Sequence, residues 1–258
     1  MTNGASLEIR NLTKRFGGVA AIDDLSFDVP QGKTVGIIGP NGAGKSTLLA
    51  LLSGLLQPDA GTIRIDGSPL TAHRSRNTAH AFARHGVRRT FQDSRLIPQA
   101  PVSEHLELAA PAPAWPTIFS ALFRRGALQD VRRRFHERAR SVLSGMDLQG
   151  TFTRSGRDLS YGQSKLVELA RVELARSRIL LLDEPFSGLA PAMRGTMTDM
   201  IRGLAAEGRT ILLVEHNLPL IQDLCDRVLV LAAGRRLAFG SYADISSNPD
   251  VIDAYVGH

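Results

Sequence analysis

Cysteine and long hydrophobic runs are scarce in this chain of 258 residues. Cys225 is the only cysteine, which excludes an intramolecular disulfide and a cysteine-only metal site and favours a reducing compartment. The apolar runs, such as those at 179–182, 211–214 and 228–233, fall far short of the ~20 residues that cross a bilayer. The N-terminus shows no basic segment followed by an apolar run, so we expect no secretory signal and a soluble, cytoplasmic protein.

Lysine is also scarce, since only four of the 31 basic residues are lysines and arginine supplies most of the net charge of +6. Such basicity is typical of a nucleic-acid or anionic-membrane partner, or of a solvated arginine-rich surface. Much of the excess lies in Arg124–Arg140, where no series of aromatic residues alternates with the arginines for stacking on bases. The apolar residues of this stretch share one helical face: Val131, Phe135, Ala139, Val142 and Leu143. We therefore predict an amphipathic helix and no nucleic-acid partner, and leave contact with lipid open.

Hydrophobic patterning predicts an α/β fold. Apolar residues make up 43% of the chain, enough for a sizeable core. Alternation near the N-terminus predicts antiparallel strands at 7–10 and 25–29, and the apolar run Thr34–Ile38 predicts a buried strand. Beyond residue 157, strands and helices alternate, which is typical of a parallel sheet with helices on both faces. The further expected strands are 61–66, 178–182, 210–214 and 227–231, and the expected helices are 46–55, 162–176, 191–206 and 217–225.

A glycine-rich loop lies between the expected strand 34–38 and helix 46–55. The segment Gly39–Thr47, with the sequence GPNGAGKST, matches the pattern of a phosphate-binding loop in the correct strand–loop–helix context. Backbone N–H groups and the positive end of the helix favour phosphate, and glycines allow its close approach. Lys45 is expected to reach the β- and γ-phosphates and Ser46 to ligate Mg²⁺. The predicted ATP-binding residues of the loop are Gly39, Asn41, Gly42, Ala43, Gly44, Lys45, Ser46 and Thr47.

Two adjacent acids, Asp183 and Glu184, end the apolar run 179–182. By itself this fragment is also typical of a strand that ends in solvated acids. In combination with the glycine-rich loop, it indicates that the charges bind something, because charge at the end of a buried strand is costly. We expect Asp183 to hold Mg²⁺ through water and Glu184 to orient, or accept a proton from, the water that attacks the γ-phosphate.

The predicted domain organisation has a helical insertion. Strand signals fade from about Thr71 to Arg157, and prolines separate helical patches there. We therefore predict a nucleotide-binding α/β core with an antiparallel β subdomain over 1–92 and 158–258, a helical subdomain over 93–157, and a C-terminal helical extension over 240–258. No internal repeat is found, so a second nucleotide domain is not expected in this chain.

With these motifs placed, the sequence resembles the ATP-binding cassette (ABC) family of P-loop NTPases. The segment Leu159-Ser160-Tyr161-Gly162-Gln163 resembles the family signature, usually LSGGQ, with Tyr161 in place of the first glycine. The resemblance implies that Ser160, Gly162 and Gln163 bind the γ-phosphate of ATP held by a second subunit, and therefore that two subunits form a head-to-tail dimer.

Three further positions match the family one by one. Phe16 matches the aromatic residue that stacks on adenine, although an isolated phenylalanine is more often part of a core. Gln92 matches the residue that links Mg²⁺ and the attacking water to the helical subdomain, and His216 matches the histidine that contacts the γ-phosphate. The resemblance thus implies Glu184, His216, Gln92 and Lys45 as catalytic residues and Ser46, Gln92 and Asp183 as Mg²⁺ ligands. Ala190 stands where the family commonly has an aspartate in the dimer-contact loop, so a carboxylate contact there is not expected.

A narrower resemblance is to the branched-chain amino acid import branch of the family. The segments that carry it are 15–22, 89–96, 159–163, 188–191, 214–217 and 248–257. It implies an integral-membrane permease and a second ATPase subunit, identical or different, as partners, and indirectly a periplasmic solute-binding protein. The chain would then be peripheral on the inner face of the cell membrane. Arg95–Gln99 is the expected permease-facing groove, and the apolar segment 114–122 would face the permease or form subdomain core.

Two alternative functions remain at this point. One is a lipid or lipopolysaccharide-export cassette, and the other is a non-transport ABC ATPase acting on DNA or the ribosome. The second usually has two fused cassettes or a long coiled coil, whereas this chain has one glycine-rich loop and no heptad pattern.

Overall fold

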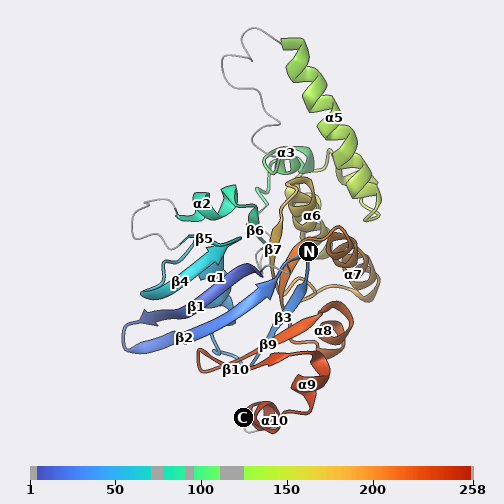
Figure 1. Ribbon diagram of the computed structural model, residues 1–258. Coiled ribbons are helices and arrows are strands. Elements are labelled where there is room, and N and C mark those ends of the chain that lie inside the picture. The colour runs from blue at the N-terminus through green and yellow to red at the C-terminus, as the bar shows by residue number, and fades with distance from the viewer. Residues whose placement is uncertain (1–4, 71–77, 91–95, 111–124, 257–258) are drawn as a thin grey trace. The chain divides into compact units, whose positions relative to one another are not determined.

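The computed structural model describes residues 5–70, 78–90, 96–110 and 125–256 (Figure 1). The chain divides into two compact units. The first comprises Met1–Arg89, Arg178–Pro185 and Ile201–His258, and the second comprises Thr90–Ser177 and Phe186–Met200. Along the chain, the second unit is thus inserted into the first.

The first unit begins with a four-stranded antiparallel sheet in the order β2-β1-β4-β5 (Figure 1). Its strands are β1 (Ala5–Phe16), β2 (Val19–Pro30), β4 (Ala60–Ile65) and β5 (Ser68–Pro69). Ile9 lies opposite Phe27 on one side and Ile63 on the other, and all three are buried. The alternating apolar residues therefore face a core, as the sequence pattern predicts.

The second sheet of this unit has six strands in the order β10-β9-β3-β8-β7-β6. Strands β3, β6, β7, β8 and β9 run parallel, and β10 runs antiparallel to β9. Strands β3 (Thr34–Ile38), β7 (Ile179–Asp183) and β8 (Thr210–Val214) are buried at every position, which explains their continuous apolar sequences. The other strands are β6 (Val87–Arg89), β9 (Arg227–Ala232) and β10 (Arg235–Gly240).

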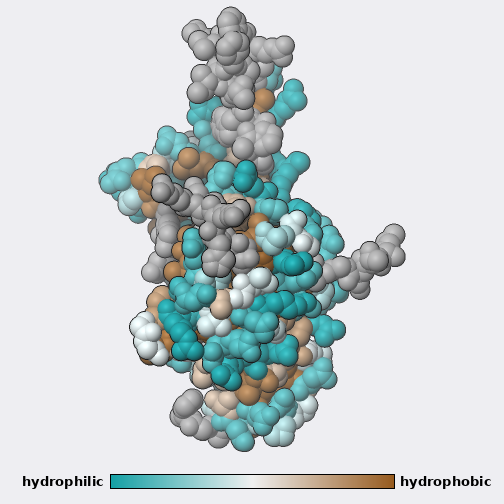
Figure 2. All heavy atoms as spheres, turned by 60° about the vertical axis from the view of Figure 1, so that its left-hand side comes forward, coloured by the Kyte–Doolittle hydropathy of each residue, from teal (hydrophilic) through white to brown (hydrophobic). Residues whose placement is uncertain are grey.

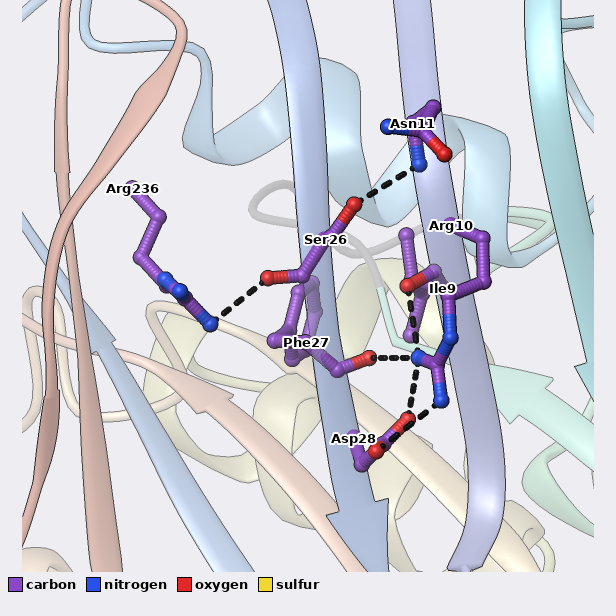
Figure 3. Close-up of polar contacts among 7 residues, drawn as sticks. All are labelled: Ile9, Arg10, Asn11, Ser26, Phe27, Asp28 and Arg236. Carbon is purple, nitrogen blue, oxygen red and sulfur yellow. Dashed lines mark hydrogen bonds and ion pairs between the residues drawn. The ribbon is translucent and has the colours of Figure 1, made fainter.

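Polar side chains stabilise the pairing of β1 with β2 and also join β2 to β10 of the six-stranded sheet. Figure 3 shows Arg10 of β1 beside Asp28 of β2, with its guanidinium bonded to main-chain oxygens of Ile9 and Phe27. In the same view, Arg236 of β10 donates to the main-chain oxygen of Ser26 at 2.9 Å. Arg235 adds an ion pair with Asp23 at 2.6 Å. The C-terminal hairpin is thereby tied to β2.

Short helices complete the first unit: α1 (Lys45–Leu52), α2 (Thr78–Arg84), α8 (Leu218–Leu224), α9 (Tyr242–Ser246) and α10 (Pro249–Val256). Helix α1 follows the glycine-rich loop and buries Leu48, Leu49, Leu51 and Leu52 in the core. It ends three residues before the predicted Leu55, where Gly54 takes a φ of +70° and stops the helix.

The second unit is helical. Its helices are α3 (Val102–Glu107), α5 (Arg125–Ser144), α6 (Tyr161–Leu174) and the first part of α7 (Pro191–Ala206). On α5, Ala139 and Leu143 are buried while Arg133 is exposed, so the described part of the arginine-rich stretch is amphipathic. The unit is larger than the predicted subdomain 93–157 because α3 and α5 pack against α6.

The α/β fold with an antiparallel subdomain and a helical insertion is therefore confirmed. Among the described residues, no helix is long and apolar enough to cross a membrane. Figure 2 shows hydrophilic residues over most of the described surface in that view, with hydrophobic residues in small groups between them.

Candidate functional site

The glycine-rich loop follows β3 and leads into α1, and its backbone requires glycine at several positions. Gly39, Gly42 and Gly44 have φ values of +149°, +79° and +100°, which disfavour residues with a Cβ. A Cβ on Gly39 would lie 2.1 Å from the main-chain oxygen of Leu231, and one on Gly44 would lie 2.3 Å from that of Ala21. The main chain of the loop thus lies so close to β9 and β2 that Gly39 and Gly44 leave no room for a side chain.

Lys45, the first residue of α1, is buried and turns back into the loop. Its Nζ donates to the main-chain oxygens of Gly39 at 2.7 Å and Pro40 at 2.9 Å. Burial lowers the pKa of Lys45, while the nearby charges of Glu184 and Asp183 raise it. A desolvated ammonium at the N-terminus of a helix is a strong attractor for phosphate.

Glu184 and His216 meet at the carboxyl ends of β7 and β8. These strands are paired so that Asp183 lies opposite Val214. Glu184 has a φ of +47°, and its N–H donates to the main-chain oxygen of Val214 at 3.0 Å. Its Oε1 lies 2.7 Å from Nε2 of His216. The sequence predicts that both residues are catalytic, and the structure places them in direct contact.

Asp183 is the last residue of β7 and is almost fully buried. Its Oδ2 accepts from the guanidinium of Arg89 at 2.7 Å. The sequence does not predict Arg89 as a partner of Asp183, because the short strand β6 that carries it is not predicted. The available signal is its position directly before Thr-Phe-Gln, whereas the pairing of β6 with β7 is seen only in the structure.

Phe16 ends β1 on the surface of the first unit, with 49% of the residue exposed and Lys14 Nζ lying 5.7 Å from the ring centroid. This position differs from the core role that an isolated phenylalanine usually has. An exposed aromatic ring is available for stacking, so its contact with adenine stays a prediction.

The signature segment belongs to the second unit and begins α6. Ser160 is the N-cap: its Oγ accepts from the Gln163 N–H at 3.2 Å, and Gln163 Oε1 accepts from the Ser160 N–H at 3.0 Å. Gly162 is buried, and a Cβ there would lie 2.2 Å from Sδ of Met193. Tyr161 is exposed and packs on Gly188, whose φ is +72°. The exposed Ser160 hydroxyl therefore lies at the positive end of a 14-residue helix.

Some predicted positions lie outside the described residues: Gln92, Arg95 and the segment 114–122. Ser46 is exposed on the first turn of α1. Within the described ranges, no group of three or more His, Cys, Asp or Glu side chains could hold a metal ion alone. The residues present fit Mg²⁺ bound together with phosphate, since such a site needs only one carboxylate and a hydroxyl from the protein.

The fold and this site define a P-loop NTPase. The family model described as ABC transporter matches residues 22–187. The chain belongs to this family, as an ATP-binding subunit that hydrolyses ATP.

Curated relatives match over almost the whole chain. The high-affinity branched-chain amino acid transport ATP-binding protein BraF of Pseudomonas aeruginosa is 38% identical, with 97% of each chain covered. LivG of Escherichia coli, a protein of the same description, is 34% identical, also with 97% of each covered. The narrower resemblance to the branched-chain amino acid branch is thus confirmed.

Solved structures share the fold. A nucleotide-free ATP-binding cassette from an ABC transporter superposes with a TM-score of 0.82 at 28% identity, covering 99% of this chain and 100% of the other. An ATP-binding cassette of an ABC transporter in its ADP conformation superposes with a TM-score of 0.79 at 29% identity, covering 99% of this chain and 100% of the other.

Proposed function

We propose that this chain is the ATP-hydrolysing subunit of an ABC importer for a branched-chain amino acid or a related small polar or amphiphilic solute. The observation that carries this proposal is the match to BraF and LivG over 97% of the chain. The geometry of the first unit supports the ATPase part, because the glycine-rich loop and the Glu184–His216 pair belong to neighbouring strands of one sheet.

Substrate binding would use the loop and Lys45. The backbone N–H groups of 39–47 surround the phosphates, and Lys45 exchanges its bonds to Gly39 and Pro40 for bonds to phosphate oxygens. Ser46 and Asp183 would hold Mg²⁺, which neutralises phosphate charge when bound. Asp183 does so from a strand end fixed in the core, which favours a constant position for its carboxylate.

Hydrolysis would depend on the Glu184 carboxylate. Its bond to His216 Nε2 fixes the side chain, so that the carboxylate can orient the attacking water and accept its proton. We further propose that His216 contacts the γ-phosphate, so that one side chain touches both Glu184 and the group that is transferred. Gln92 is proposed to join this group.

A second subunit would complete the site. The hydroxyl of Ser160 and the N–H of Gly162 lie at the start of α6, and we propose that they, together with Gln163, bind the γ-phosphate of the ATP held by the partner. The partner is a second copy of this chain or a related cassette. Ala190 lies exposed in the loop before α7 and brings no charge to the proposed interface.

Transport requires partners in the membrane. We propose that the second unit, including residues 96–99, contacts an integral-membrane permease, and that the chain lies peripherally on the cytoplasmic face of the cell membrane. A periplasmic solute-binding protein would deliver the solute to that permease.

The test is co-purification followed by reconstitution. The tagged chain is expected to bring down two polytopic permease subunits, and proteoliposomes containing them should take up leucine only with ATP and the solute-binding protein. Capture of a lipid-export permease, or of ribosomes or DNA without any permease, would overturn the import proposal.

A further inference from the structure

A buried ion pair links the last residues of two neighbouring strands in the first unit. Arg89 ends β6, the edge strand of the six-stranded sheet, and lies opposite Leu181 of β7. Side chains of a strand alternate between faces, so Leu181 and Asp183 share one face of the sheet. From the neighbouring strand, Arg89 reaches Asp183 diagonally on that face, and its guanidinium donates to Oδ2 at 2.7 Å.

The Arg89–Asp183 pair is buried, and this restricts its geometry. The side chains of Arg89 and Asp183 are 10% and 6% exposed. Charges that have left water require close partners in a defined geometry, and removal of one partner leaves the other uncompensated. The bond from the rigid guanidinium therefore restricts the Asp183 side chain more than its position at the end of a strand would alone.

We propose that Arg89 is a positioning residue that orients the Asp183 carboxylate for Mg²⁺. This inference rests on the proposed Mg²⁺ role of Asp183. The bond from Arg89 restricts the position of Oδ2, so the Asp183 side chain is ordered before Mg²⁺ binds. A role limited to holding β6 on β7 predicts a stability effect with no change in metal dependence.

Arg88 supplies a matched control. It is the neighbouring residue on the same strand, lies opposite Leu180 and so points to the other face of the sheet. Its guanidinium donates to the main-chain oxygens of Ala83 at 3.3 Å and Val87 at 3.2 Å. Substitution at Arg88 therefore perturbs β6 without touching Asp183.

The experiment compares Arg89→Met, Arg89→Lys, Arg88→Met and Asp183→Asn in the full chain. A fluorescent ATP analogue is titrated in EDTA and over a series of Mg²⁺ concentrations, and Mn²⁺ bound with ATP is observed by electron paramagnetic resonance. For Arg89→Met we expect the Mg²⁺ concentration that gives half of the Mg²⁺-dependent change in nucleotide affinity to rise by about tenfold. This is the usual effect of losing a residue that orients a metal ligand. The Mn²⁺ spectrum should change, and nucleotide affinity in EDTA should not.

Arg89→Lys keeps the charge but has a single, more flexible donor, so a smaller rise is expected, and Arg88→Met should shift neither quantity. If Arg89→Met does not fold, Arg89→Lys decides: an unchanged Mg²⁺ dependence in the folded variant overturns the proposal. An equal loss of nucleotide affinity with and without Mg²⁺ also overturns it. If Asp183→Asn itself leaves Mg²⁺ dependence unchanged, the error lies in the Mg²⁺ role of Asp183.

Discussion

Glu184 keeps its backbone in the left-handed region, with a φ of +47°, directly after a strand that is buried at every position. For a residue with a side chain, this conformation costs on the order of 1–3 kcal/mol. Two bonds compensate: the N–H donates to Val214, and the carboxylate contacts His216. The strained turn points the carboxylate away from the direction that a continued strand would give it.

Glu184→Gln is therefore expected to lower steady-state ATPase activity by about 100-fold or more, the usual range for losing a general base. ATP binding should persist, because the amide keeps the size of the side chain and the loop is unchanged. A phosphate-release assay and a nucleotide-binding titration measure the two effects.

Glu137→Gln is the control for this variant, since it makes the same change at an exposed position of α5. Its activity should equal that of the unmodified chain. ATPase activity within a few-fold of normal in Glu184→Gln would show that another residue activates the water.

At the scale of elements, the apolar content of a strand decides whether the sequence predicts it. Strands β3, β7 and β8 were predicted because each is a continuous apolar run inside the sheet. Strand β6 was missed because Val87-Arg88-Arg89 has a single apolar residue. Its arginines are tolerated because Arg88 bonds to main-chain oxygens and Arg89 pairs with Asp183, which is 94 residues away.

Strand β10 was missed for a similar reason. It begins with Arg235 and Arg236, whose partners Asp23 and Ser26 are more than 200 residues earlier in the chain. The loop residues of the site, by contrast, are adjacent in sequence and form a recognisable pattern. Pairs such as Arg89 with Asp183 depend on which strands become neighbours, and no local pattern records that order.

The glycine-rich loop gives a paired prediction. Gly44→Ala should abolish nucleotide binding and lower the melting temperature, because the Cβ would lie 2.3 Å from the main-chain oxygen of Ala21 in β2. Gly42→Ala should impair binding with a smaller loss of stability, since its Cβ would meet nothing within 4 Å and only the positive φ is disfavoured.

Thermal unfolding and nucleotide titration of both variants test this ordering. Equal losses of melting temperature would mean that the loop can shift away from β2, which would contradict the packing described above.

At the scale of the whole molecule, Ser160 has two roles, as the N-cap of α6 and in the proposed contact between subunits, and one substitution can distinguish them. Ser160→Asp should leave the melting temperature unchanged, because aspartate caps a helix as well as serine does. The same change places a carboxylate against the partner's γ-phosphate, so ATP-driven dimerisation in a Glu184→Gln background should be lost.

Light scattering after gel filtration with ATP measures the dimer. Thr153→Asp adds the same charge at an exposed position of the same unit and should still dimerise. A full dimer yield from Ser160→Asp would contradict the head-to-tail arrangement.

The position of β3 between β8 and β9 has a consequence for biosynthesis. The ribosome completes β3 at Ile38, but its first neighbour begins at Thr210 and the second at Arg227. At ~5–20 residues per second, the strand waits roughly 10 to 40 s for both partners. The contiguous stretch Thr90–Ser177 emerges in the meantime and can collapse first. A nascent chain released before Arg227 would contain every residue of the glycine-rich loop and still lack β9, whose Leu231 carbonyl lies against Gly39 of the loop.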